Sequence, residues 1–344
     1  MTALLLFFCF LVSAGITYYF SQPNARGVIL DHPSDRSLHH TSISRNGGQA
    51  IFLSICLGIL GMALQPSLPP FDNTLFLAML VIAAISYSDD RCSLSPLLRL
   101  MAHGITAGLL VTTGFQLTEL SFPTVVWPLS NSFSVVISML FIVWMINLYN
   151  FMDGLDGLAG GMALIGFGWI SLQAVWAGEY HYALFSAIIV SSSLGFLIFN
   201  LPPARIFMGD LGSSLLCFFA SALILWGIQH RVFFLWQALL VFSPFIADAT
   251  LTLLRRIWHR EKIWQAHRQH YYQRLVLLGW SQKRTLGWEY GLMLSCAISA
   301  SIAPQLSKSW QWAIVVSGCS FYLLPIYIVH YWEQTQALTP AKAQ

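Results

Sequence analysis

The chain has 344 residues, of which 56% are hydrophobic and only 9% are charged. A soluble domain usually carries about 25% charged residues, so this chain has too few polar groups to cover a soluble surface. The composition excludes an ordinary soluble protein and favours an integral membrane protein. The net charge of +3 is small and there is no basic block, so nothing favours nucleic-acid binding. Its six cysteines are scattered, which argues against a zinc site and a disulfide framework.

Apolar runs long enough for membrane helices recur along the whole chain, since a spanning helix needs about 20 mostly apolar residues. We expect about eleven of them, at 2–20, 48–65, 74–88, 96–114, 132–150, 158–177, 182–200, 212–229, 232–255, 286–304 and 309–331. The first run lacks a basic start, which favours an uncleaved anchor over a signal peptide. The sequence thus predicts an all-α integral membrane protein with a single polytopic domain, 1–344.

The basic residues predict the orientation of these helices, because cytoplasmic loops of membrane proteins are enriched in Lys and Arg. With the N-terminus outside, only Arg231 and Lys308 of the 17 basic residues fall in outside segments. The odd number of helices places the C-terminus in the cytoplasm as well. The expected cytoplasmic loops are about 21–47, 88–95, 150–158, 200–211 and 256–285. Every unusual polar cluster of the sequence lies in or beside one of these loops.

The first acidic cluster is "SYSDDR", which ends an expected span at Asp89 and Asp90. Adjacent carboxylates repel one another unless a cation or a basic group lies between them. The alternative is a helix-end acid pair with Arg91 as its partner.

The second cluster, "NLYNFMDGLDGLAGG", repeats a polar residue every three positions, at Asn147, Asn150, Asp153 and Asp156. In a helix these residues would form one slowly drifting polar stripe. Gly154 and Gly157 would let the backbone approach a ligand. The alternative is a simple turn, with Asp156 capping the helix that begins near Leu158.

Two further acids stand out. Asp210 lies between glycines in "RIFMGDLGSS", just before an apolar run. It is either an N-cap acid or a hard-oxygen ligand for Mg²⁺, which usually takes only one or two protein carboxylates. Asp248 falls inside the ninth expected span, where acids are functional candidates. A structural pairing of Asp248 with a basic residue is an equal alternative.

The largest loop carries "HRQHYYQR", with His267 and His270 three residues apart. A zinc site would need further ligands, and none is nearby. Arg268 and Arg274 favour an anionic partner instead, because arginine offers paired donors to phosphate. The alternative is a solvated basic loop attracted to anionic lipid headgroups.

Taken together, the clusters resemble the polyprenyl-phosphate N-acetylhexosamine-1-phosphate transferase family, of the glycosyltransferase family 4 type. The resemblance covers about residues 31–275 and rests on five motifs: "DHPSDRSLHH…RNGG", "SYSDDR", "NLYNFMDGLDGLAGG", "PPARIFMGDLGSS" and "HRQHYYQRL". The H-R-x-H form followed by "YYQRL" looks like the branch that initiates O-antigen synthesis. The first loop departs from many members, because "SISRNGG" has no proline around the basic residue.

The resemblance implies transfer of N-acetylhexosamine-1-phosphate from a UDP-sugar to undecaprenyl phosphate, with release of UMP. This step would initiate O-antigen or related cell-envelope polysaccharide synthesis, within lipopolysaccharide biosynthesis. It implies Mg²⁺ as the cofactor, with Mn²⁺ open, and a multi-pass protein of the bacterial inner membrane with a cytoplasmic active site. Membrane lipid is an expected partner, and a homodimer is left open. The donor sugar cannot be read from the sequence.

The resemblance also assigns roles to residues of this chain. Catalytic roles fall on Asp89, Asp90, Asp153 and Asp156. Metal binding falls on Asp210, with Asn150 as the second choice. Substrate binding falls on Arg45, Asn147, Asn150, His267, Arg268, His270 and Arg274. Because the second pKa of a phosphate monoester is about 6, the acceptor needs little deprotonation near neutral pH. We therefore expect the paired acids mainly to organise cations and orient the acceptor.

Three alternatives remain at this stage. The first is the phospho-MurNAc-pentapeptide translocase reaction of peptidoglycan synthesis, in the same family. The second is a secondary transporter using Asp153, Asp156 and Asp248, which predicts polar residues on both faces and an internal repeat. The third is a membrane scaffold, which leaves the acids at the ends of the spans unexplained.

Overall fold

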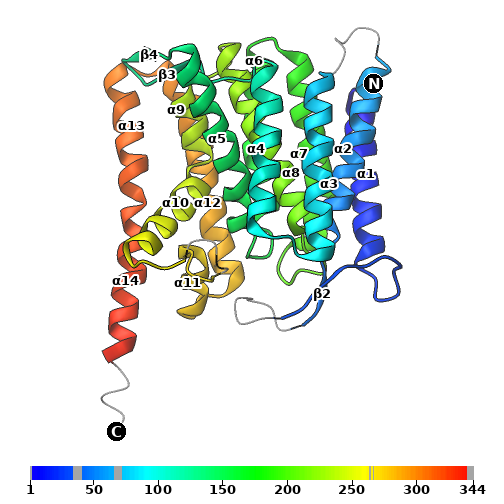
Figure 1. Cartoon of the computed structure of the whole chain (residues 1–344). Helices are drawn as coiled ribbons and strands as arrows, with labels where there is room; N and C mark the ends of the chain where they lie inside the picture. Colours follow the sequence, from blue (N-terminus) through cyan, green and yellow to red (C-terminus); the bar gives the residue numbers. More distant parts are fainter. Residues whose placement is uncertain (1, 34–40, 66–71, 263–264, 266, 339–344) are drawn as a thin grey trace.

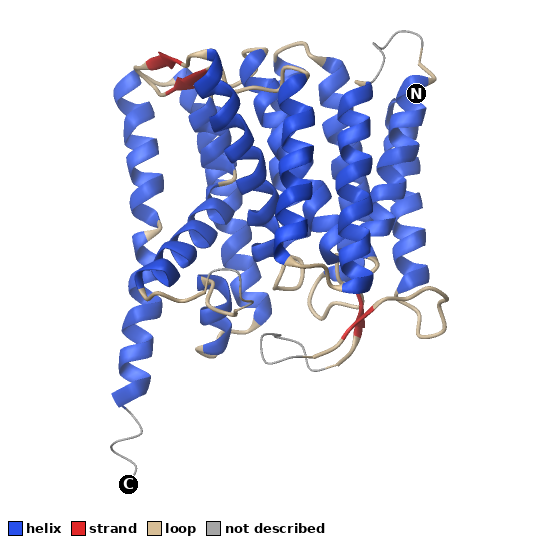
Figure 2. Ribbon diagram, in the orientation of Figure 1, coloured by secondary structure: helices blue, strands red, loops and turns tan. Residues whose placement is uncertain are grey.

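The computed structural model describes residues 2–33, 41–65, 72–262, 265 and 267–338. This part of the chain is almost entirely helical, as Figures 1 and 2 show. The longer helices are α1 (Thr2–Phe20), α2 (Gly47–Ala63), α3 (Asn73–Cys92), α4 (Pro96–Thr112), α5 (Asn131–Met152), α6 (Leu158–Trp176), α7 (Tyr180–Asn200), α8 (Gly209–Gln229), α10 (Ser243–Trp258), α12 (Gln282–Ile302), α13 (Lys308–Phe321) and α14 (Leu323–Leu338). The two short helices are α9 (Leu235–Val241) and α11 (Tyr271–Leu277).

The described chain also contains a short 3-10 helix, η1 (Ala303–Gln305), and two antiparallel strand pairs. At one end of the bundle, β1 (Leu30–Asp31) pairs with β2 (Ile43–Ser44). At the other end, β3 (Glu119–Ser121) pairs with β4 (Val126–Pro128). In Figure 1 these ends are the lower and the upper end of the bundle, and α11 and the C-terminus lie at the lower end.

The helices confirm a multi-pass all-α membrane protein. Six described stretches are long and apolar enough to cross a membrane, and the bent pair α9–α10 makes a seventh. They include α1, α5, α6, α7, α8 and the run over α13 and α14. Helix also occupies every one of the eleven expected ranges. The number of crossings and the orientation stay predictions.

The ninth expected span is not one straight helix. The chain breaks between α9 and α10, and the two helices meet at 79°. Pro244 lies in the first turn of α10, where its missing N–H and its ring do not permit a continuous helix. The last expected span is likewise divided into α13 and α14. The loop expected at 256–285 contains α11, so it is more ordered than the sequence suggested.

Helix α8 forms the centre of the bundle. It is buried from Leu211 through Ile228, and it packs against α2, α3 and α5. By contrast, only 17% of the apolar window of α1 and 6% of the window over α13 and α14 is buried. Because α8 is enclosed on all sides, its N-terminus is fixed relative to the helices whose lower ends surround it.

The first loop reaches the N-terminus of α8 through a pair of glycines. Gly47 and Gly48 donate their N–H groups to the carbonyls of Phe207 at 3.0 Å and Met208 at 2.7 Å. A Cβ on Gly48 would lie 2.3 Å from the backbone nitrogen of Gly212. The close approach of α2 to α8 therefore requires glycine at this position.

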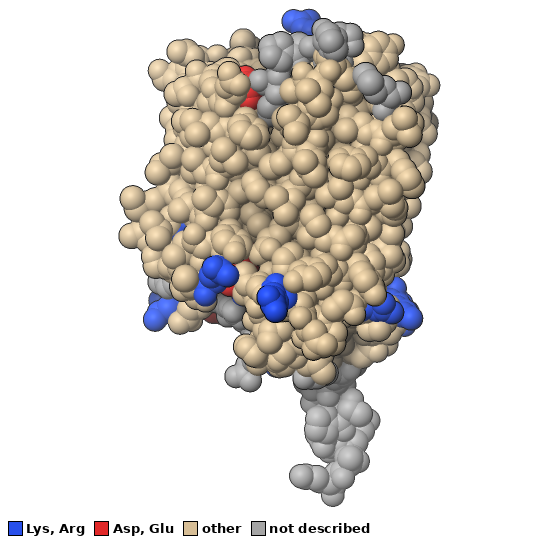
Figure 3. All heavy atoms as spheres, turned by 90° about the vertical axis from the view of Figure 1, so that its right-hand side faces the viewer, with Lys and Arg blue, Asp and Glu red and all other residues tan. Residues whose placement is uncertain are grey.

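Basic side chains gather at one end of the bundle. Figure 3 shows blue Lys and Arg atoms mostly at the lower end, with one group at the top and a broad band without charge between them. This distribution agrees with the asymmetry predicted from the sequence. Arg36 and Lys342, which belong to the same set, lie outside the described residues.

We expect Gly48→Ala to destabilise the protein, because the new methyl group meets backbone atoms that cannot move aside. Overpacking of this kind typically costs about 1–3 kcal/mol. The matched control is Gly104→Ala in α4, where nothing lies within 4 Å of the added Cβ. Thermal unfolding of the detergent-purified protein measures both. A Gly48→Ala protein as stable as the control would contradict the close contact between α2 and α8.

Candidate active site

An arginine and two acids from three segments meet at the lower end of the bundle. Arg45, after β2, donates from Nε and Nη2 to Oδ1 of Asp90 at 2.9 and 2.5 Å. Its Nη2 also donates to Oδ2 of Asp210 at 3.2 Å. The family resemblance assigned all three residues to the site, and the structure brings them together.

Asp90 also receives the N-terminus of α8. Its Oδ1 accepts the N–H of Asp210 at 2.9 Å, and its Oδ2 accepts the N–H of Leu211 at 3.0 Å. An anion at this position is favoured by the unpaired N–H groups and by the helix dipole. Asp210 itself lies in the first turn of α8, and the N-cap residue is Met208. Of the two alternatives for Asp210, the N-cap role is therefore wrong, because Asp90 of α3 supplies the carboxylate there.

Gly209 is required by this arrangement. Its φ of +72° lies in the left-handed region, which side chains rarely adopt. An added Cβ would also lie 2.5 Å from the carbonyl oxygen of Arg45 and 3.0 Å from Oδ1 of Asp90. The glycine in "MGD" thus lets three segments converge.

Asp89 points to a different set of partners. Its carboxylate accepts the N–H of Leu94 at 2.6 Å and a bond from Nη1 of Arg99 at 3.1 Å. Arg91, the partner that the sequence suggested, instead lies 5.3 Å from the ring of Tyr87. The two adjacent acids therefore bind different arginines, Asp90 binding Arg45 and Asp89 binding Arg99, while the side chain of Asp89 also lies beside that of Asp210.

Asp153 follows α5 and stands out because no hydrogen bond from the described residues reaches its carboxylate. Burial raises the pKa of Asp153 well above its usual value, and the negative charges of Asp210 and Asp90 add to this shift. Arg45 opposes this shift. A half-buried carboxylate next to other acids is a group that needs a cation.

These acids fit a Mg²⁺ ion better than a metal bound by many side chains. Within the described ranges, no group of three or more His, Cys, Asp or Glu is arranged to hold a metal ion. Mg²⁺ needs only one or two carboxylates, with water and phosphate completing its shell. Asp210 accepts a bond only at Oδ2 from the described residues. Asp153 and Asp210 therefore offer open oxygens, whereas Oδ1 of Asn150 already accepts from Ser213 at 2.7 Å.

The two asparagines of α5 contact different helices. Nδ2 of Asn147 donates to the carbonyl of Val143 at 2.7 Å and lies 3.2 Å from Nδ1 of His103 in α4. Asn150 faces α8, and α5 ends at Met152. The single polar stripe expected over four residues is thus wrong. His103 was not predicted from the sequence, because its only signal is a lone ionisable residue within an apolar helix.

Asp156 holds the loop before α8. Its Oδ2 accepts the N–H of Ala204 at 2.9 Å, and the N-cap of α6 is Gly157 without a side-chain bond. Capping of α6 by Asp156 is therefore wrong. Asn200 supports the same loop, since it accepts from the N–H of Gly157 at 2.9 Å and donates to the carbonyl of Ile206 at 2.8 Å. Asn200 was also missed, because its partners are distant in sequence.

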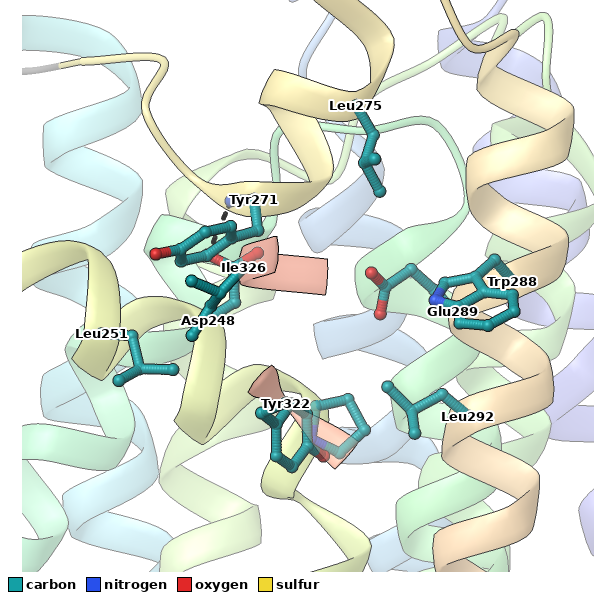
Figure 4. A pocket seen from close by; sticks show the side chains of 10 residues that line it. Asp248, Leu251, Tyr271, Leu275, Trp288, Glu289, Leu292, Tyr322 and Ile326 are labelled. Atoms are coloured by element: carbon teal, nitrogen blue, oxygen red, sulfur yellow. Dashed lines mark hydrogen bonds between the residues drawn. The ribbon is translucent and has the colours of Figure 1, made fainter. Parts of the chain in front are cut away.

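Asp248 holds the histidine loop, residues 267–277, which includes α11. Its carboxylate accepts from Nδ1 of His270 at 3.0 Å and from the N–H groups of Tyr271 at 3.0 Å and Tyr272 at 3.1 Å. Figure 4 shows Asp248 beside Tyr271. Of the two roles that the sequence left open for Asp248, these contacts support the structural one.

The cavity in Figure 4 is too small for a nucleotide sugar. It lies between α10, α11, α12 and α14, and its walls include Tyr322 and Glu289, an acid that the sequence analysis did not single out. Its volume of about 30 Å³ has room for one or two water molecules.

Aromatic contacts join the histidine loop to the end of α5. The ring of His270 lies 6.1 Å from Phe151 and 5.8 Å from Tyr272. The hydroxyl of Tyr272 donates to the carbonyl of Phe151 at 3.2 Å. A Cβ on Gly154 would lie 2.3 Å from this hydroxyl oxygen. Gly154 therefore makes room for a tyrosine, whereas the sequence suggested room for a ligand.

The charged and titratable residues of the histidine loop differ in whether their side chains are free to bind a ligand. Burial, with the nearby charges of His270 and Arg256, lowers the pKa of His267 to about 4, so this ring is neutral at neutral pH. Arg268 is exposed and forms no ion pair within the described part of the chain. Arg274 is engaged: its Nε donates to Oε1 of Glu333 in α14 at 2.8 Å.

Comparison with known proteins identifies the family. The family model described as Glycosyl transferase family 4 matches residues 73–228. A probable undecaprenyl-phosphate N-acetylglucosaminyl 1-phosphate transferase of Bacillus subtilis is 30% identical, over 79% of this chain and 76% of its own length. The chain belongs to the polyprenyl-phosphate N-acetylhexosamine-1-phosphate transferases. It is therefore a sugar-phosphate transferase.

Two further relatives of the transferase differ in how much of this chain their similarity covers. An undecaprenyl-phosphate alpha-N-acetylglucosaminyl 1-phosphate transferase of Yersinia pestis is 25% identical, over 94% of this chain and 90% of its own length. A phospho-N-acetylmuramoyl-pentapeptide-transferase of Bacillus subtilis is 34% identical, but over only 43% of this chain and 45% of its own length.

We expect Arg45→Lys to reduce sugar-phosphate transfer by at least tenfold, equivalent to about 1.4 kcal/mol in the activation free energy. Lysine keeps the charge but has no planar fork to bind two carboxylates. Arg26→Lys in the same loop is the control, because the Arg26 side chain is exposed. Initial rates of both purified variants provide the measurement. Equal rates would show that Arg45 acts only through its charge.

Proposed function

We propose that this transferase moves N-acetylhexosamine-1-phosphate from a UDP-sugar to undecaprenyl phosphate and releases UMP. The main support is the cluster formed by Arg45, Asp90, Asp210 and Asp153 at one end of a membrane bundle, with the histidine loop beside it. The names of the relatives from Bacillus and Yersinia support the same acceptor and donor sugar. UDP-N-acetylglucosamine is accordingly the first donor to test.

We further propose eleven crossings, with the N-terminus outside and the site in the cytoplasm, in a bacterial inner membrane. Helix in all eleven expected ranges supports the number. The concentration of basic side chains at the lower end supports the orientation. A cytoplasmic site would have direct access to a soluble nucleotide sugar and to a lipid phosphate at the membrane surface.

The residues of the cluster are suited to place positive charge beside the reacting phosphates. Phosphoryl transfer depends mainly on positioning and charge neutralisation, with the attacking and leaving oxygens roughly in line. Asp210 and Asp153 would hold Mg²⁺, which supplies charge neutralisation at the pyrophosphate when bound. Arg45 keeps Asp90 and Asp210 together in spite of their repulsion. Exposed Arg268 and neutral His267 are suited to bind the donor phosphates and uridine.

Asp90 has little capacity left to act as a general base. Four hydrogen bonds already reach its carboxylate, two from Arg45 and two from the start of α8. The acceptor phosphate is mostly dianionic near neutral pH, since its second pKa is about 6. Asp90 therefore acts by fixing Arg45 and α8, and thereby the position of Asp210.

We also propose that this reaction initiates the synthesis of O-antigen or a related lipopolysaccharide polymer. The H-R-x-H form of the histidine loop supports this role. The pentapeptide-transferase reaction has weaker support, because that relative covers less than half of the chain. A transporter has less support still, since the acids of the cluster lie together at one end of the bundle.

The purified protein, supplied with undecaprenyl phosphate, Mg²⁺ and a panel of UDP-sugars, is expected to release UMP with at least one N-acetylhexosamine donor. Chelation of the metal should abolish release, and added Mg²⁺ should restore it, with Mn²⁺ as a comparison. Released UMP is quantified by chromatography. If no donor gives UMP, the proposed function is wrong. Release only with the pentapeptide donor would favour peptidoglycan synthesis instead.

Asp90→Asn should lower turnover by about 100-fold at every pH between about 6 and 9, because asparagine cannot neutralise Arg45 or the N-terminus of α8. The control is Asp72→Asn, since Asp72 caps α3 through bonds to Thr74 and Leu75 far from the site. Turnover is measured across the pH range. Full recovery at high pH would show that Asp90 deprotonates the acceptor.

A further inference from the structure

The C-terminal helix α14 lies against the histidine loop. In Figure 1 it continues below the other helices at the lower end of the bundle, and it contacts α11. The contact is an ion pair: the guanidinium of Arg274 forms two hydrogen bonds to the carboxylate of Glu333, from Nε to Oε1 at 2.8 Å and from Nη2 to Oε2.

Arg274 cannot be left without this partner. The residue is 8% exposed, and a guanidinium buried to this extent is strongly destabilising when its counter-ion is removed. The Glu333 side chain is 39% exposed, so the pair lies at the edge of the protein, where Glu333 is accessible to substitution without opening the core.

The same arginine supports the start of α11. Its guanidinium carbon lies 5.2 Å from the centre of the Tyr271 ring, and its backbone N–H donates to the carbonyl of His270 at 2.9 Å. The N–H of Tyr271 in turn donates to Asp248. Two acids from two different helices thus hold α11, with Asp248 of α10 at its beginning and Glu333 of α14 at its first turn.

Helix α11 depends on these contacts because it has only seven residues. Isolated helices shorter than about 12 residues are marginal in water. Its N-terminal end carries His270, whose ring lies 4.9 Å from that of His267. Any loosening of α11 therefore displaces His270 and, through the contact between the two rings, His267, which is proposed to bind the donor.

We propose that Glu333 is a positioning residue for the histidine loop and acts through Arg274. The catalytic consequence rests on the proposed function, whereas the ordering of α11 does not. A planar guanidinium paired with a carboxylate is the feature that matters, so a reversed pair at the same positions satisfies it as well. Among the described residues Glu333 bonds only to Arg274, so its effect on the proposed site would pass through α11.

The experiment compares Glu333→Ala and Glu333→Gln with the reversed pair Arg274→Glu/Glu333→Arg in the full chain. The control is Gln334→Ala, because Gln334 bonds only to His330 of the same helix among the described residues. Hydrogen exchange over residues 270–278, followed by mass spectrometry, reports the order of α11. UMP release gives KM for UDP-N-acetylglucosamine, the donor used as the probe, and kcat.

Glu333→Ala and Glu333→Gln are expected to raise both the exchange rate in α11 and the donor KM by about tenfold, with a smaller change in kcat. The reversed pair should bring the exchange rate in α11 back to within about threefold of the wild-type value. Unchanged exchange in both single variants would overturn the proposal. So would an equal effect of Gln334→Ala, which would indicate a general role of α14.

If wild-type protein releases no UMP while exchange in α11 responds to Glu333, the proposed function fails and the ordering of α11 by Glu333 stands. If UMP release is normal and exchange and KM are both insensitive to Glu333, the proposed function stands and this inference fails.

Discussion

The carboxylate of Asp90 connects the first loop, α3 and α8. It accepts two bonds from Arg45 and two from the backbone at the start of α8, while it is itself almost completely buried. A buried charge is tolerated only when its partners compensate for the lost hydration, and removing one partner costs several kcal/mol. The lower end of the bundle is therefore organised around one ion. Gly209 lies against this carboxylate and Gly48 against the first turn of α8, and a bulkier residue at either position would push the partners of Asp90 apart.

The enclosed position of α8 makes this arrangement rigid. Helices on every side bury α8 over almost its entire length, so its first turn has little freedom to shift. Asp210 extends from that turn, and Ser213, one turn later, holds Asn150 of α5. The acids that face the proposed substrates are thus supported by the most deeply buried helix, although they lie at the surface of the bundle.

Much of this organisation could be predicted from the sequence, because apolar runs and the spacing of acids are local signals. The helix ranges, the acid pair at the end of α3 and the link of Asp210 to a helix start all follow from short stretches of chain, whereas Arg45 was assigned only through the family resemblance. Partners could not be predicted, since they depend on contacts between distant segments. Asp156 binds Ala204 and Asp248 binds the histidine loop, and neither pairing leaves a trace in the residues nearby. His103 and Asn200 were missed for the same reason.

The bend between α9 and α10 changes where Asp248, an acid within an apolar stretch, lies relative to the membrane. In one straight span Asp248 would lie at depth in the hydrocarbon, whereas the 79° bend turns α10 toward the lower end of the bundle. The buried side of α10 carries Asp248 toward α11, while Leu254, Ile257 and Trp258 are largely exposed on the other side. Such a two-sided helix is suited to lie at the boundary between acyl chains and headgroups. In that position α10 would fix the depth of the histidine loop relative to the lipid surface.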